Sequence, residues 1–90
     1  MDLYEAIHEM RRLSSEGRSF EFSFMSYNSS KGTSDGVIMV HHGRLLKRES
    51  KEHHKHAEFV EAYINLDTME ARRFYQPLLM TFNGRKVTLQ

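Results

Sequence analysis

The chain has 90 residues, of which 39% are hydrophobic and 28% are charged, and its formal net charge is +1. These values are typical of a globular chain, and this length supports one small hydrophobic core. We therefore expect a single domain over residues 1–90. The sequence has no cysteine, which excludes disulfides, thiolate metal sites and thiol catalysis.

No segment approaches the roughly 20 consecutive apolar residues that a membrane helix requires. The start of the chain carries Asp2 and Glu5 and has no apolar run, so it does not fit a signal peptide. The sequence predicts a cytoplasmic protein with no membrane partner.

The first predicted element is a helix over residues 2–15. Asp2 can cap its first turn, and Glu5 stands three residues later, as in a capping box. Gly17 is well placed to end the helix in the left-handed conformation. Helical spacing joins the apolar residues into one stripe, formed by Leu3, Ala6, Ile7, Met10 and Leu13.

Two strands are predicted next. In "SFEFSF", residues 19–24, phenylalanines alternate with polar residues, which is the period of a strand with one buried face. Residues 28–36, "NSSKGTSDG", predict a flexible loop. Residues 37–48, "VIMVHHGRLLKR", predict a second strand that is apolar on both faces, and the pair His42-Gly43 predicts a bulge within it.

Residues 57–66, "AEFVEAYINL", fit two periods. A helix would align Phe59, Val60, Tyr63 and Ile64. A strand would place one set of alternate residues on a common face, namely Val60, Ala62, Ile64 and Leu66. The strand is preferred because the following residues supply a turn at Asp67–Glu70 and a returning strand, with Tyr63 opposite Phe74.

The C-terminal segment predicts a hairpin around Asn83-Gly84, the favoured pair for a two-residue turn. Pro77 should break or bend the strand before it, because proline donates no hydrogen bond. The predicted pairs on the apolar face are Met80 with Val87 and Leu78 with Leu89. Those on the mixed face are Thr81 with Lys86 and Leu79 with Thr88.

These elements predict an α+β fold, in which an N-terminal helix precedes a curved antiparallel sheet or small barrel of about five strands joined in sequence. Such a thin sheet cannot cover all its apolar side chains. Residues assigned to outer faces are Met25, Tyr27, Phe59, Tyr75 and Leu79. Two alternatives follow: contact with another protein chain or with a second copy, or burial by sheet curvature.

The segment "KEHHKHAEF", residues 51–59, concentrates three histidines. His53 and His56 are the candidate metal ligands, but no established zinc spacing is present, and a solvated connector is the preferred interpretation. No cofactor is expected. Phosphate-loop and nucleophile motifs are lacking, so the sequence predicts no enzyme. Four glutamates are interpreted as solvated charge: Glu49, Glu52, Glu58 and Glu61.

An alternative function is the binding of single-stranded nucleic acid, in which cations contact phosphates and rings stack on bases. The candidate residues are Arg72, Arg73, Arg85, Lys86, Phe74 and Tyr75. Twelve acidic residues argue against this alternative.

The segments "SFEFSFMSYNSSKGTSDG" and "RRFYQPLLMTFNGRKVTL" resemble small uncharacterised proteins encoded in bacterial prophages and related mobile elements. The resemblance implies a setting in which short non-enzymatic proteins serve in particle assembly or as accessory binders, and it assigns no site residues. The sequence thus predicts a non-enzymatic protein-interaction or assembly module.

Overall fold

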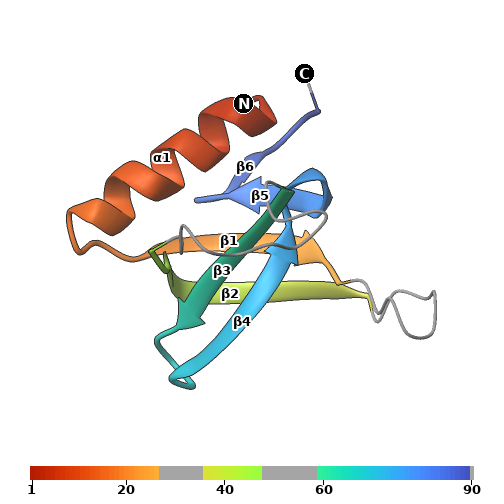
Figure 1. Cartoon of the computed structure of the whole chain (residues 1–90). Helices are drawn as coiled ribbons and strands as arrows, with labels where there is room; N and C mark the ends of the chain where they lie inside the picture. The colour runs from red at the N-terminus through yellow and green to blue at the C-terminus, as the bar shows by residue number, and fades with distance from the viewer. Residues whose placement is uncertain (27–35, 48–58, 90) are drawn as a thin grey trace.

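The computed structural model describes residues 1–26, 36–47 and 59–89. It contains one α-helix and a six-stranded antiparallel sheet with the strand order β4-β3-β2-β1-β5-β6 (Figure 1). The elements, in chain order, are α1 (Leu3–Ser15), β1 (Phe20–Met25), β2 (Val37–Leu45), β3 (Val60–Asn65), β4 (Glu70–Tyr75), the 3₁₀ helix η2 (Gln76–Leu78), β5 (Leu79–Phe82) and β6 (Arg85–Lys86). The predicted α+β class is confirmed, and the curved sheet is open rather than closed into a barrel.

The helix begins and ends as its sequence predicts. The Glu5 backbone N–H donates to the Asp2 carboxylate at 2.7 Å, and Gly17 has a φ of 74°. At the far end, the Ser14 hydroxyl accepts a hydrogen bond from the Leu45 N–H at 2.8 Å, which ties the last turn of α1 to β2. The residues of α1 that are buried against the core are Ala6, Met10 and Leu13.

The link between β4 and β5 determines the curvature of the sheet. These strands lie four spacings apart in the strand order, which would be about 19 Å in a flat sheet. Only Gln76–Leu78 join them, and the four-residue step from Tyr75 to Leu79 spans at most about 14 Å. The sheet therefore has to bend back on itself, and the β3–β4 hairpin crosses β1 and β2 in Figure 1. The expectation that all strands join their sequence neighbours is wrong at this point, since β5 pairs with β1.

Inside this bend lies an aromatic core. The rings of Phe24 and Phe74 are 5.3 Å apart although β1 and β4 are separated by two strands, and Phe22 meets Tyr63 edge to face at 5.1 Å. All four residues are at most 5% exposed. Ring contacts across the folded sheet thus hold its two halves together, and they add stability beyond that of the apolar area that the rings bury.

The strand interpretation of residues 57–66 is confirmed by β3, but its register and its inward face are not as predicted. Asn65 pairs with Glu70, so the turn begins one residue early and Tyr63 lies opposite Arg72 instead of Phe74. Tyr63 still contacts the Phe74 ring diagonally at 5.9 Å. The side chains of Tyr63 and Glu61 point inward from β3, because the Tyr63 ring packs against the aromatic core and Glu61 lies on the same face of the strand. The predicted common face is only partly buried, at Val60, Ala62, Ile64 and Leu66.

The bulge predicted at His42-Gly43 is confirmed. Phe20 pairs with Gly43 and Phe22 with Val40, so β2 has one extra residue between these pairs. A Cβ atom at Gly43 would lie 2.7 Å from the Phe22 ring and 2.9 Å from a Val40 methyl group. Glycine is therefore required here for close packing.

The C-terminal hairpin turns at Asn83-Gly84, both with positive φ, and Thr81 pairs with Lys86 as predicted. The predicted apolar face is confirmed for Val87, which is buried, but the faces assigned to Leu79 and Met80 are wrong. Leu79 is buried beside Phe24 and Met80 is 38% exposed, because β5 has a bulge between its pairs with Phe24 and Ser23. The predicted break at Pro77 is confirmed by η2, whereas the loop predicted at 28–36 lies almost wholly outside the described residues.

Substitution of Gly43 by alanine should lower the free energy of unfolding by about 1–3 kcal/mol, because the added methyl group forces Phe22 or Val40 out of place. Urea unfolding of the wild type and Gly43→Ala measures this difference. An unchanged midpoint would contradict the close approach described for this glycine.

Burial raises the pKa of the Tyr63 phenol above its ordinary value of 10.0. The neutral phenol therefore stabilises the fold at pH values below about 10, and this contribution is lost as the pH rises toward the higher pKa of the folded state. The variant Tyr63→Phe should lose less stability than the wild type between about pH 9 and pH 11. Urea midpoints test this, with Tyr4→Phe at an exposed ring as the control.

Candidate functional site

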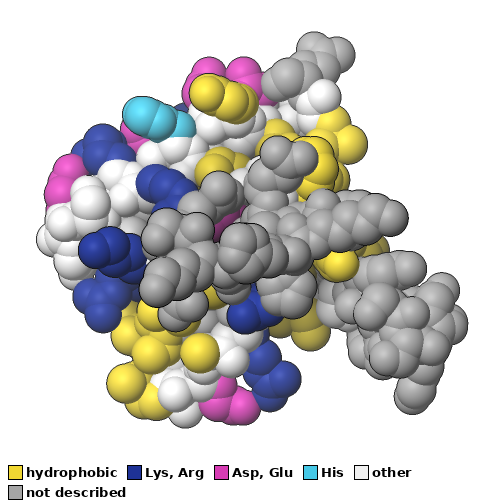
Figure 2. Space-filling model, in the orientation of Figure 1, with side chains coloured by type: hydrophobic (Ala, Val, Ile, Leu, Met, Phe, Trp, Pro, Cys, Tyr) yellow, Lys and Arg dark blue, Asp and Glu magenta, His cyan; other side chains and the backbone are white. Residues whose placement is uncertain are grey.

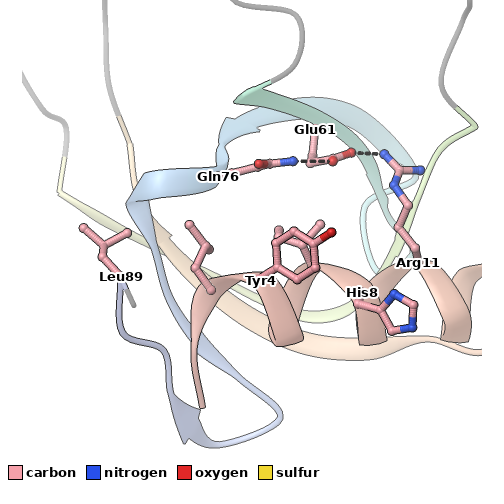
Figure 3. A pocket seen from close by; sticks show the side chains of 8 residues that line it. Tyr4, His8, Arg11, Glu61, Gln76 and Leu89 are labelled. Carbon is pink, nitrogen blue, oxygen red and sulfur yellow. Dashed lines mark hydrogen bonds and ion pairs between the residues drawn. The ribbon is translucent and has the colours of Figure 1, made fainter.

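A pocket of about 510 Å³ lies between α1, the end of the sheet near η2, and the C-terminal segment (Figure 3). The side of the pocket that α1 forms can be understood from the sequence, because its lining residues are spaced four apart and therefore lie one above the other on the helix. The residues that line the pocket are Leu3, Tyr4, Ile7, His8, Arg11, Glu61, Gln76 and Leu89.

Glu61, on β3, is the buried charge of this pocket. Its side chain is 0% exposed, one carboxylate oxygen forms an ion pair with the Arg11 guanidinium, and the other accepts a hydrogen bond from Gln76 Nε2 at 2.7 Å. Figure 3 shows the polar ends of Gln76, Glu61 and Arg11 in a row, with the Arg11 side chain reaching Glu61 from α1. These contacts satisfy a carboxylate that would otherwise be very costly to bury.

The prediction that Glu61 is a solvated charge is therefore wrong. It lies two residues before Tyr63, so it takes the same inward parity as that ring. The alternation was visible in the sequence, but it does not say which parity faces the core. Arg11 and Gln76, which lie 50 and 15 residues from Glu61, carry no local signal of a contact with it.

Arg11 reaches the pocket from α1 while remaining partly open to solvent. Its side chain is 34% exposed, and among the described residues Glu61 is the acceptor that its guanidinium contacts. Since arginine carries five N–H donors in a planar fork, most of them remain available to a ligand.

A second surface lies at the beginning of β2. Val37, Ile38 and Met39 are 54%, 37% and 47% exposed. The neighbouring strand β3 pairs with β2 only at Gly43–Leu45, so within the described chain the outer edge of Val37–His41 has no strand beside it. Among the described residues, the side chains of Val37, Ile38 and Met39 and the outer edge of this half-strand are therefore accessible, whereas Val40 is buried in the core. The predicted apolar character of both faces of β2 is confirmed here.

The two histidines of the β2 bulge form separate pairs. His41 Nδ1 lies 3.1 Å from a Glu21 carboxylate oxygen, and His42 Nδ1 lies 3.0 Å from an Asp67 oxygen. Residues 1–26, 36–47 and 59–89 contain no group of three or more possible metal ligands. The candidate ligands His53 and His56 lie outside the described residues, so that interpretation stays a prediction.

The candidate nucleic-acid residues are distributed over two strands that do not pair with each other. Arg72, Arg73, Phe74 and Tyr75 belong to β4, whereas Arg85 and Lys86 form β6 at the other end of the strand order. Arg72 forms an ion pair with Glu70 at 2.8 Å. Phe74 is 3% exposed within the aromatic core, so the expectation that its ring stacks on a base is wrong.

No protein-family model matches the chain, and comparison with curated proteins and with solved structures likewise found no match. The resemblance to prophage proteins therefore stays a prediction. Among the described helical residues, none form a segment that is both long enough and apolar enough to span a bilayer.

Replacing Arg11 with methionine should lower the free energy of unfolding by about 3 kcal/mol, because it leaves the Glu61 carboxylate buried without its cation. Chemical denaturation measures the loss, and adding Glu61→Leu in the same chain should recover much of it.

The matched control is Arg12→Met on the next helix position. Arg12 pairs with Glu9 at 2.6 Å and with Glu16 at 2.9 Å on the exposed face, and the hydrogen bond from Arg12 lowers the pKa of Glu9. Exposed pairs stabilise little, so the midpoint of Arg12→Met should stay close to that of the wild type. If Arg11→Met and Arg12→Met lost the same free energy of unfolding, the burial of Glu61 would not make its ion pair more important for stability than an exposed pair.

Proposed function

We propose that this protein is a non-enzymatic assembly module that associates with a second copy of itself through the first half of β2. The observation that carries the proposal is the exposure of three consecutive apolar residues, Val37, Ile38 and Met39, on a half-strand that β3 does not flank. The side chains of these three residues offer no nucleophile, acid or base.

Strand geometry explains why such a segment favours another strand as its partner. Consecutive side chains of a strand point to opposite faces, so the exposed triplet is apolar above and below the sheet. Its outer edge presents backbone N–H and C=O groups, which another strand satisfies by extending the sheet. A partner strand thereby covers apolar area and pairs backbone groups in one step.

A second copy supplies a matching strand. In an antiparallel register that places Ile38 opposite its own counterpart, Val37 lies opposite Met39 and the whole contact is apolar and uncharged. Such an interface is isologous, as in most homodimers. It is also small compared with the roughly 1,600 Å² of a standard interface, so we expect weak, concentration-dependent association.

The described residues provide no observation that favours the alternative of single-stranded nucleic-acid binding. Its two basic pairs lie on different strands, and one of its two proposed rings is in the core.

Sedimentation velocity over a concentration series tests the proposal. The wild type should shift from monomer toward dimer as the concentration rises from low micromolar toward millimolar, and Met39→Lys should remain monomeric because a charge on an edge opposes strand pairing. The control is Met69→Lys, at a residue that is 67% exposed in the β3–β4 turn, and it should behave as the wild type does. A wild type that stays monomeric throughout, or equal effects of both substitutions, would refute self-association through β2.

A further inference from the structure

We propose that the pocket beside α1 binds a small molecule with a carboxylate group and an apolar body, and that Arg11 is the residue that holds the carboxylate. This inference concerns a surface separate from the exposed half of β2 and does not depend on self-association.

The size and lining of the pocket suit such a ligand. Its volume of about 510 Å³ lies within the range of small-molecule sites, roughly 300–1,000 Å³. Leu3, Ile7 and Leu89 supply apolar walls, and Tyr4 adds an aromatic ring (Figure 3). The polar groups of the lining side chains are the Tyr4 hydroxyl and His8 on the helix, and the row of Arg11, Glu61 and Gln76. A mainly apolar cavity with a few polar groups is the usual form of a ligand site.

The charged residues of the pocket favour a ligand whose polar end is an anion. Both carboxylate oxygens of Glu61 are engaged, one by Arg11 and one by Gln76, so Glu61 is not open to a ligand cation. Arg11 uses Nη2 for Glu61, and its side chain is 34% exposed, so its guanidinium retains N–H groups that can donate to a ligand. A planar guanidinium fork matches a carboxylate with two parallel hydrogen bonds.

The buried ion pair also has a positioning role in this proposal. An apolar residue at position 61 would fill the same inward site of β3 without the cost of burying a charge. Glu61 instead holds the end of a long, flexible arginine against the pocket wall, so that less conformational entropy is lost when a ligand binds. In Figure 2, hydrophobic, basic, acidic and histidine side chains lie close together over α1, at the upper left of the molecule.

The test is an NMR titration of the ¹⁵N-labelled full chain with hexanoate as the probe. We expect saturable amide shifts in the first two turns of α1 and around Gln76 and Leu89. Hexanol and hexylamine, which keep the alkyl chain but lack the carboxylate, should bind at least roughly tenfold more weakly, as the loss of one charge-assisted contact implies. Acetate, which keeps the carboxylate but lacks the chain, should also bind more weakly because it buries less apolar area. Equal responses to hexanol and hexanoate would overturn the proposal.

Three variants connect the binding to named residues. Leu89 is 69% exposed, so Leu89→Glu and Leu89→Lys should both fold. Both lose the same apolar contact, but the glutamate should weaken hexanoate binding more than the lysine does, because it adds a negative charge beside the carboxylate. Arg11→Lys keeps the charge but loses the fork, and it should weaken binding by roughly tenfold. Unchanged affinity in both Arg11→Lys and Leu89→Glu would refute the site. The same titration on Met39→Lys separates this result from self-association, because hexanoate should bind that variant as it binds the wild type.

Discussion

The fold depends on a short covalent link. Three residues, Gln76–Leu78, join strands that a flat sheet would hold farther apart than the chain can reach. The sheet must therefore fold over, and this brings Phe74 of β4 against Phe24 of β1. Pro77 within the link favours a turn, because it cannot take part in a strand ladder. Local chain geometry and the long-range ring contacts thus require the same curvature.

The same bend leaves the outer edge of the first half of β2 without a neighbouring strand among the described residues. At the bulge of His41 and His42, the pairing of β2 changes within the residues that the structure describes: Val37–Val40 pair with β1 alone, Gly43 pairs with both β1 and β3, and the residues after it pair with β3. Gly43 permits the change because the Phe22 ring occupies the space of a side chain there. The exposed triplet at the start of β2 is thus a direct result of where the sheet bends.

The pocket beside α1 results from the way in which the helix packs on the folded sheet near η2. The helix is fixed at its first turn by the Asp2 cap and at its last by the Ser14–Leu45 hydrogen bond, so its outer stripe faces the η2 end of the sheet. The inward parity of β3 then directs Glu61 toward this space, where Arg11 meets it. One surface of the protein is thus apolar and suited to a strand, while the other combines apolar walls with an anchored cation.

The sequence by itself determined the features that depend on neighbouring residues. These include the capped helix, the alternating phenylalanines of β1, the bulge at Gly43, the break at Pro77 and the turn at Asn83-Gly84, because caps, alternation and positive φ are local properties. Only the tertiary structure decided which parity of β3 faces the core, that β5 pairs with β1, and that Leu79 is buried. Those choices depend on packing between residues far apart in the chain. The Arg11–Glu61 pair belongs to the same group, since alternation shows that Glu61 and Tyr63 share a face but only contacts with Phe22 and Phe74 make that face the inner one.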